Sequence, residues 1–253
     1  MQDQFSRTRM FFGTTGMERL FQSRVAVFGI GGVGGYTAEA LVRSGVGHIA
    51  LIDDDKICLT NLNRQIIATH DTVGQYKVDV MAQRIAAINP HTAVETHRLF
   101  YTPDTADSIN LADFDYIVDA VDTVTAKLEL VTRAGAANVP IISAMGAGGK
   151  LDPTAFIVAD IFSTEYDPLA RAMRRELRTR GITALKVVYS KEPTLKPAAE
   201  FEEECRRNCV CPPGTVRKCT ARHQIPASNA FVPPAVGLIL AGEVIKDLIG
   251  GNA

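Results

Sequence analysis

The stretch that decides the fold is residues 24–45, RVAVFGIGGVGGYTAEALVRSG. Its first part, RVAVFGI at residues 24–30, is a short apolar run rich in valine, which is typical of a buried strand. The last part, TAEALVRSG at residues 37–45, has the composition of a helix closed by glycine. Between them, the pattern G-x-G-x-x-G runs from Gly29 to Gly34. In this order of strand, glycine turn and helix, backbone N–H groups at the helix N-terminus bind phosphate.

The same alternation of strand and helix continues along the chain. Further strands are expected at residues 48–53, 94–99, 116–121, 140–144, 155–158 and 185–190, and helices at 74–89, 123–137, 168–180 and 235–249. Strands joined by helices form mainly parallel sheets that are covered on both faces. The sequence therefore predicts an α/β protein with a Rossmann-like sheet. Residues 191–229 show little apolar periodicity and are expected to leave the sheet before the chain returns in a final helix.

Length and composition fit one domain of an ordinary globular protein. The chain has 253 residues, of which 46% are hydrophobic. We expect a nucleotide-binding core at residues 1–159, a basic cysteine-containing excursion at 160–230 and a C-terminal helix at 231–253. The polar start MQDQFSRTRM carries no secretory signal. The apolar run at 235–240 is far shorter than the roughly 20 residues of a bilayer span, so we expect a cytoplasmic protein with no membrane anchor.

Charge is distributed unevenly, although the formal net charge is only −1. Residues 1–159 hold 13 basic and 17 acidic side chains, whereas residues 160–222 hold 13 basic and 9 acidic ones. The near-neutral total argues against a polybasic protein or an acidic tail. The local basic excess indicates either a polyanionic partner or a solvated helix face, and both interpretations stay open.

A nucleotide site is predicted where the strands end. Asp53 closes the second strand, where a carboxylate can accept hydrogen bonds from ribose hydroxyls. A polar, partly cationic set follows it: Asp54, Asp55, Asn61, Arg64 and Lys77. Backbone amides suffice for a dinucleotide pyrophosphate, whereas the charge of a triphosphate calls for arginine and lysine. This favours ATP over a nicotinamide dinucleotide, and Asp122, at the end of a later strand, could hold Mg²⁺ on the phosphates.

Several segments resemble the ATP-binding domain of the ThiF/MoeB-type adenylyltransferases, which belong to the ubiquitin-activating superfamily. The segments are the glycine turn, IDDDKICLTNLNRQ at 52–65, VGQYKVDV at 73–80 and VDAVD at 118–122. The resemblance implies a dimeric enzyme that adenylates a carboxylate with ATP and Mg²⁺. The ATP ligands that it implies are Gly29, Gly31, Gly32, Gly34, Asp53, Asp55, Asn61, Arg64, Lys77, Asp122 and, from the other subunit of the homodimer, Arg7. Arg64, Lys77 and Asp122 are the expected catalytic residues, with Asp122 beside Mg²⁺ and the α-phosphate.

Motifs along the whole chain are similar to the tRNA threonylcarbamoyladenosine dehydratase branch of this superfamily. They are FSRTRMFFG at 5–13, GAGGKLDPT at 146–154, DPLARAMRRELR at 167–178, KVVYSKE at 186–192 and NAFVPPAVGLILAGEVIKDL at 229–248. The resemblance implies that the threonyl carboxylate of the modified adenosine in tRNA is adenylated, and that loss of AMP closes a ring. The residues expected to face tRNA are Arg171, Arg174, Arg175 and Arg178; a solvated helix explains them equally well.

Other functions remain open. Activators of sulfur-carrier proteins belong to the same superfamily but typically carry two CxxC zinc pairs, and this chain has no CxxC. Such an activator is the main alternative. A cysteine desulfurase or sulfur acceptor is a further candidate partner. A nicotinamide-dependent oxidoreductase would leave Arg64 and Lys77 unexplained. A nucleotide-sensing protein without turnover would bind ATP but release no AMP.

A cysteine cluster lies within the basic excursion. Its members are Cys205, Cys209, Cys211 and Cys219, spaced C-x3-C-x-C-x7-C. Four thiolates close together repel one another unless a cation holds them, so Zn²⁺ or an iron–sulfur cluster is one interpretation. Free thiols, sulfur relay and disulfides are the others. The fifth cysteine, Cys58, stands between Ile57 and Leu59 and is expected in the core.

Overall fold

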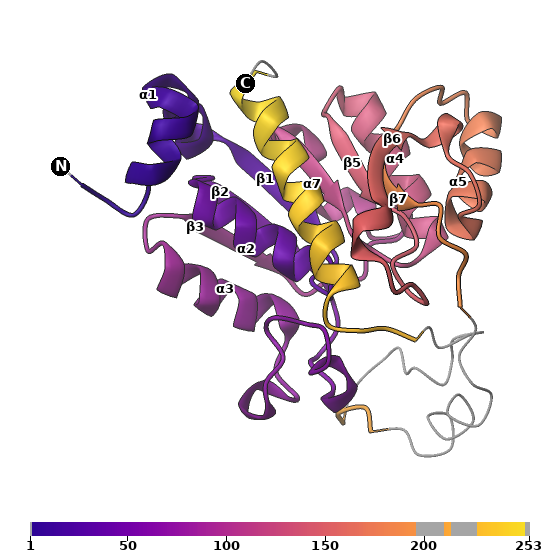
Figure 1. Ribbon diagram of the computed structural model, residues 1–253, viewed down its shortest axis with the longest axis horizontal. Coiled ribbons are helices and arrows are strands. Elements are labelled where there is room, and N and C mark those ends of the chain that lie inside the picture. The colour runs from indigo at the N-terminus through magenta and orange to yellow at the C-terminus, as the bar shows by residue number, and fades with distance from the viewer. Residues whose placement is uncertain (1, 196–209, 214–226, 251–253) are drawn as a thin grey trace.

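A computed structural model describes residues 2–195, 210–213 and 227–250 of the chain. These residues contain one seven-stranded sheet with the strand order β3-β2-β1-β4-β5-β7-β6 (Figure 1). The strands are β1 (Arg24–Phe28), β2 (His48–Ile52), β3 (Ala93–His97), β4 (Tyr116–Asp119), β5 (Ile141–Ala144), β6 (Phe156–Asp160) and β7 (Lys186–Ser190). Only β6 runs antiparallel to its neighbour. The predicted mainly parallel sheet is confirmed.

Helices cover both faces of the sheet, as the sequence predicted. They are α1 (Ser6–Gln22), α2 (Gly34–Ser44), α3 (Lys77–Ile88), α4 (Val124–Ala137), α5 (Pro168–Thr179) and α7 (Val232–Ile249). Val25 and Val27 of β1 point into the core shared with α1, α2, α3 and α7. The alternate residues Ala26 and Phe28 pack against α4 on the other face, where α5 lies beside α4. This alternation is the period-2 pattern of a strand buried on both faces.

The order in which strands are added to the sheet reverses between β1 and β4. From β1 the chain adds β2 and β3 on one side and then crosses to β4 on the other. In open α/β sheets, ligands bind at the carboxyl ends of the strands at such a reversal. The fold therefore predicts that a ligand would bind where β1 and β4 end.

The last helix, α7, is a core helix, as its apolar sequence predicted. It packs across α2 so closely that a Cβ atom on Gly237 would lie 2.4 Å from the Val33 carbonyl oxygen. The Thr37 hydroxyl donates to the Gly237 carbonyl at 3.1 Å. It begins at Val232, three residues earlier than predicted, because proline is well tolerated in the first turn of a helix. Among the described residues, no helix is both long and apolar enough to cross a membrane.

One feature departs from the sequence-based expectation. The N-terminal helix α1 was not predicted, because it buries only Gly16, Met17 and Leu20 and is kinked at Gly13, where φ is +69°. The predicted helix at 168–180 and strand at 185–190 are confirmed as α5, which packs on α4, and β7, which lies between β5 and β6. After β7, the described residues 191–195 lie outside the sheet, as predicted for the start of the 191–229 segment.

Candidate nucleotide site

The glycine turn between β1 and α2 leaves no room for side chains at two of its positions. Gly29 has φ of +88°, and a Cβ atom there would lie 2.6 Å from the Ala120 carbonyl oxygen. A Cβ atom on Gly34 would lie 1.8 Å from the Gly29 carbonyl oxygen. Val33, the N-cap of α2, makes no side-chain capping bond. The Gly35 N–H donates to the Gly31 carbonyl at 3.0 Å, so an external anion would be bound by the other N–H groups of the first turn. The turn fits a nucleotide phosphate.

Asp53 fastens the glycine turn to the end of β2. One carboxylate oxygen, Oδ2, accepts a hydrogen bond from the Ile30 backbone N–H at 2.7 Å, and the other, Oδ1, accepts one from the Asp55 N–H at 2.8 Å. Burial raises the pKa of Asp53, against the opposing pull of Lys77. An ionised carboxylate offers about four acceptor positions, so two backbone bonds leave capacity for ribose hydroxyls.

Lys77, the first residue of α3, points its ammonium group into this acidic corner. Its Nζ atom lies 2.7 Å from Asp55 Oδ2 and 3.7 Å from Asp53 Oδ2. Burial lowers the pKa of Lys77, but Asp53 and Asp55 outweigh burial and raise it above its ordinary value. The charge of Asp122 adds to this increase. The structure thus brings these predicted site residues together around one buried cation.

Arg64 lies beside the glycine turn. A Cβ atom on Gly32 would lie 3.3 Å from Arg64 Cγ, and the Arg64 guanidinium donates to the Thr60 carbonyl at 3.1 Å. Asn61 has a local role here, because its side-chain oxygen accepts the Cys58 N–H at 3.0 Å. Its amide nitrogen is therefore the atom that a phosphate would meet.

Asp122 follows β4 on the same edge of the sheet. It is exposed, and its Oδ1 atom accepts a hydrogen bond from the Thr123 hydroxyl at 3.3 Å. Its charge contributes to the raised pKa of Lys77, after the larger effects of Asp53 and Asp55. An exposed carboxylate at this edge is the ligand type that Mg²⁺ prefers.

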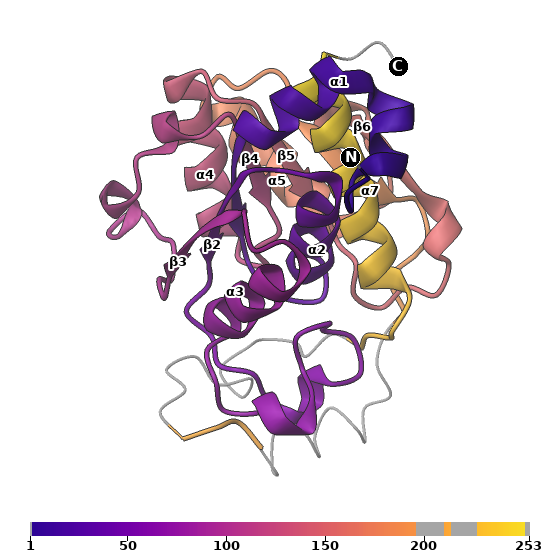
Figure 2. The same ribbon diagram turned by 90° about the vertical axis from the view of Figure 1, so that its left-hand side faces the viewer.

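Arg7 is the one predicted ATP ligand that lies far from this edge. It stands at the start of α1, two residues after Phe5, whose ring packs against Phe21 at 5.3 Å. Phe21 in turn lies against Gly45 and Gly47, just before β2 begins. α1 therefore sits at the amino end of the sheet, opposite the loops that carry Arg64 (Figure 2). Arg7 does not reach the nucleotide site of its own chain.

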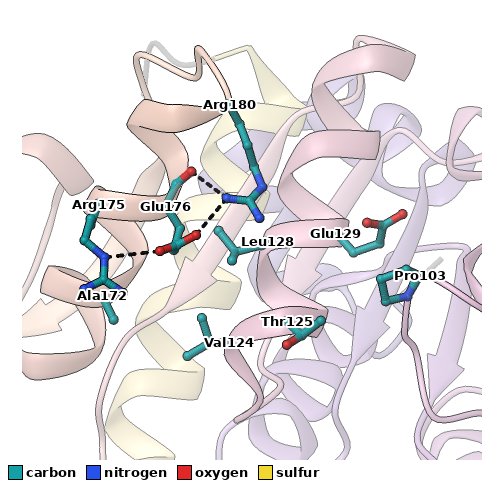
Figure 3. A pocket seen from close by; sticks show the side chains of 9 residues that line it. All are labelled: Pro103, Val124, Thr125, Leu128, Glu129, Ala172, Arg175, Glu176 and Arg180. Carbon is teal, nitrogen blue, oxygen red and sulfur yellow. Dashed lines mark hydrogen bonds and ion pairs between the residues drawn. The ribbon is translucent and has the colours of Figure 1, made fainter.

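The four α5 arginines differ in their surroundings. Arg174 is half-buried, and its guanidinium donates to the Thr164 carbonyl at 2.9 Å, while that of Arg178 lies 5.5 Å from the centre of the Phe162 ring. Arg175 is exposed and pairs with Glu176 at 3.2 Å at the wall of a cavity of about 330 Å³ between α4 and α5 (Figure 3). Arg171, in the first turn of α5, is exposed and nearest the carboxyl edge of the sheet.

The cysteine cluster is only partly described. Cys205, Cys209 and Cys219 lie outside the described residues, whereas Cys211 is half-buried. The described segment 210–213 lies against the loop that follows β2: Cys58 Sγ donates to the Val210 carbonyl at 3.5 Å. The expectation that Cys58 lies in the core was wrong. Its side chain is half-buried at the surface of that loop, because the chain turns outward after Ile57.

Sequence reasoning missed two buried charged residues behind the turn that carries Asp122. They are Asp119 and Lys127, and both side chains are fully buried. The available signal was Asp119 itself, the first acidic residue of VDAVD, at the end of an otherwise apolar strand. A charge at that position needs a partner inside the fold.

Fold and site together define a nucleotide-binding protein of the α/β class, in which buried and half-buried cations face a glycine turn. The chain belongs to the ThiF family, whose model matches residues 5–252. The tRNA threonylcarbamoyladenosine dehydratase of Bacillus subtilis (strain 168) is 43% identical over 250 residues, which cover 98% of this chain and 96% of the relative. The enzyme of the same name from Escherichia coli (strain K12) is 37% identical over 207 residues, covering 79% of this chain and 77% of the relative.

Solved structures agree with these sequence relatives. A crystal structure of the E. coli tRNA N6-threonylcarbamoyladenosine dehydratase, TcdA, in complex with ATP has a TM-score of 0.82 and 31% identity, and covers 97% of this chain and 93% of that chain. The complex of the same enzyme with AMP has a TM-score of 0.83, with 97% and 94% covered. This chain thus shares its fold with an enzyme crystallised with both ATP and AMP.

Proposed function

We propose that this protein is an ATP-dependent tRNA threonylcarbamoyladenosine dehydratase. The threonyl carboxylate of the modified adenosine attacks the α-phosphate of ATP, which gives an acyl adenylate and releases pyrophosphate. The carbamoyl group of the same modification then attacks the acyl carbon, and AMP leaves. The net change in the nucleoside is the loss of one water. The observation that carries the proposal is the Lys77 ammonium, held between Asp53 and Asp55 beside the glycine turn.

Each site residue would have a separate role in adenylation. The glycine turn and the N-terminus of α2 would bind phosphate oxygens, and Asp53 would bind the ribose. Arg64 and Lys77 would offset negative charge as it develops on the phosphates. Asp122 would hold Mg²⁺, which supplies further charge on the same oxygens when it is bound. Ring closure within one nucleoside requires positioning rather than a covalent enzyme intermediate, so no cysteine is assigned as a nucleophile.

The protein would work as a homodimer in which Arg7 serves the partner's nucleotide. Two observations support this: Arg7 is exposed on α1, and it lies at the opposite end of the sheet from its own site. The same helix exposes Met10 and Phe11, which are 86% and 77% accessible to solvent. Large apolar side chains this exposed are typical of interfaces.

The tRNA would approach over the first turns of α5. Asp167, the N-cap of α5, accepts the Gly146 N–H at 3.2 Å, so α5 begins at the edge of the sheet where the nucleotide would bind. Arg171 is therefore the arginine best placed for phosphate contacts near the reacting nucleoside, with Arg175 further along. Arg174 would act indirectly, because its guanidinium is bound to Thr164.

The remaining proposals rest on the sequence. Zn²⁺ or an iron–sulfur cluster would be held by Cys205, Cys209, Cys211 and Cys219, and a cysteine desulfurase or sulfur acceptor would be the partner if these thiols relay sulfur instead. The segments 1–159, 160–230 and 231–253 would act as one domain. A tRNA substrate implies a cytoplasmic location.

The proposal is tested by AMP release. The purified protein is incubated with ATP, Mg²⁺ and tRNA that carries threonylcarbamoyladenosine, with the same tRNA lacking the modification as control. Release of AMP only with the modified tRNA supports the proposal. Nucleotide turnover that requires a sulfur-carrier protein, with none on modified tRNA, would show instead an activator of that carrier.

A further inference from the structure

We propose that Asp119, Lys127 and Ser143 form a buried positioning cluster that holds Asp122 where adenylation requires it. This inference rests on the proposed function. The three residues come from β4, α4 and β5, and their side chains meet directly behind residues 120–122, the turn that carries Asp122.

The Lys127 ammonium group donates all three of its hydrogen bonds to groups beside it in the buried cluster. Its Nζ atom donates to Asp119 Oδ2 at 3.0 Å, to the Ser143 hydroxyl at 3.2 Å and to the Ala144 carbonyl at 2.8 Å. An ammonium group has three donors, so none remains for a ligand. The Ser143 hydroxyl donates to the same Asp119 oxygen. Lys127 therefore cannot contact the nucleotide, and its effect must pass through Asp119.

Asp119 transmits this restraint to the turn. Its second oxygen, Oδ1, accepts the Val121 N–H at 3.2 Å. The turn is held from its other side by the Ala120 N–H, which donates to the Phe28 carbonyl at 2.8 Å. Ala120 also forms the floor of the glycine turn, where its carbonyl leaves no space for a Cβ atom on Gly29. The Asp119 carboxylate thus fixes the residue just before Asp122, while Ala120, the floor of the phosphate site, is held independently by the Phe28 carbonyl.

Stability alone gives little reason for a charged pair at this place. Removing two charges from water is expensive, and well-packed apolar residues of similar size are often equally stable or more so. What an apolar pair cannot supply is an acceptor for the Val121 N–H. We therefore infer that the cluster fixes the turn at residues 120–122. This turn sets the position of Asp122 relative to Lys77.

Two double variants separate this role from packing: Asp119→Asn with Lys127→Met, and Asp119→Leu with Lys127→Met. Both remove the charge pair, and asparagine and leucine have nearly the same shape. Only asparagine keeps an oxygen for the Val121 N–H. We expect the leucine variant to release AMP about tenfold or more slowly compared with the asparagine variant, since small displacements of a reacting group have effects of this size. It should also need several-fold more Mg²⁺ for its half-maximal rate.

Binding of ATP in the absence of tRNA provides a second readout, because the glycine turn and Lys77 remain. Both double variants should bind a fluorescent ATP analogue within about threefold of the unmodified protein, so the defect lies in kcat rather than in affinity. Glu39→Gln is the matched control. Glu39 is also buried and pairs with Arg84 at 2.6 Å, but it lies on α2 beneath the other face of the sheet. Its AMP release should be unchanged.

Equal, undiminished AMP release from the two double variants would overturn the inference, and so would a parallel loss of ATP binding. If neither double variant folds, Ser143→Ala takes their place, because it removes one hydrogen bond to Asp119 and one acceptor of Lys127. Slower AMP release at unchanged ATP affinity would then support the inference, and an unchanged rate would overturn it. Failure of the unmodified protein to release AMP would refute the proposed function instead.

Discussion

The ammonium group of Lys77 lies 3.7 Å from the carboxylate of Asp53, and both side chains are almost fully buried. Asp53 holds the glycine turn through the Ile30 N–H, so Lys77 stabilises the acid that shapes the phosphate site. A triphosphate at the glycine turn offers the same ammonium group further anionic partners. The pair therefore links the local structure of the site to its proposed chemistry.

Replacing Lys77 by methionine should slow AMP release by roughly 100-fold or more, since one preorganised charge in an active site is worth about that much. It should also lower the free energy of unfolding by about 3–5 kcal/mol, because a buried carboxylate loses its cation. Stopped assays of AMP and urea unfolding measure the two effects. Lys56→Met, which removes a lysine from the neighbouring loop, is the control and should change neither AMP release nor the free energy of unfolding to this extent. A Lys77→Met protein of normal activity would contradict the role given to this residue.

Arg64→Ala and Asp122→Ala should each abolish AMP release while leaving the fold intact. The bonds of Arg64 to Thr60 and Asn63 are within one surface loop, and Asp122 is exposed, so neither change disturbs the core. Chromatography of AMP and thermal unfolding followed by circular dichroism check both statements. Near-normal turnover in either variant would refute the role of that residue.

Arg171→Ala should weaken tRNA binding more than Arg178→Ala does. Arg171 is exposed at the end of α5 next to the nucleotide site, whereas Arg178 is in the last turn and lies over Phe162. Loss of one phosphate contact should reduce the slope of log affinity against log salt by about one. Filter binding at several salt concentrations measures this slope. Equal affinities and slopes for the two variants would point to another tRNA surface.

Acid should destabilise the protein through Glu39. Burial raises the pKa of Glu39, but its hydrogen bonds to Arg84 and Arg43 outweigh burial and lower it below its ordinary value. The stability that Glu39 contributes is thus present above its unfolded-state pKa and is lost as the pH falls through the folded-state value. The midpoint temperature of thermal unfolding should therefore decrease as the pH is lowered below about 5. This decrease should be less steep in Glu39→Gln. Parallel curves for the two proteins would contradict this.

The cysteine cluster should bind metal. Protein purified without oxygen should contain enough zinc or iron to fill about one site in each chain, because four thiolates need a cation to stay together. The metal content of Cys211→Ser should be lower. Elemental analysis provides the measurement. Metal-free protein with intact thiols would leave the interpretation as free or sulfur-relaying cysteines.

The sequence predicted the parts of the fold and site that local patterns specify. The turn at Gly29 needs a positive φ and a close backbone approach, which leaves a visible glycine pattern. Asp53, Lys77 and Asp122 follow strands or begin helices at one edge, so the rule for parallel sheets brought them together.

Long-range contacts could not be predicted in this way. Nothing in residue spacing showed that Arg174 binds Thr164, or that Cys58 meets Val210. The burial of Lys127 could not be predicted either. A lysine in a helix is usually exposed, and the partners of Lys127 come from two separate strands.

The mass of the modified nucleoside tests the proposed reaction most directly. Modified tRNA is treated with the protein, ATP and Mg²⁺, digested to nucleosides and analysed by mass spectrometry, with reactions lacking ATP as control. We predict that threonylcarbamoyladenosine becomes lighter by one water in step with AMP release. An unchanged nucleoside, with the protein folded and ATP bound, would contradict it.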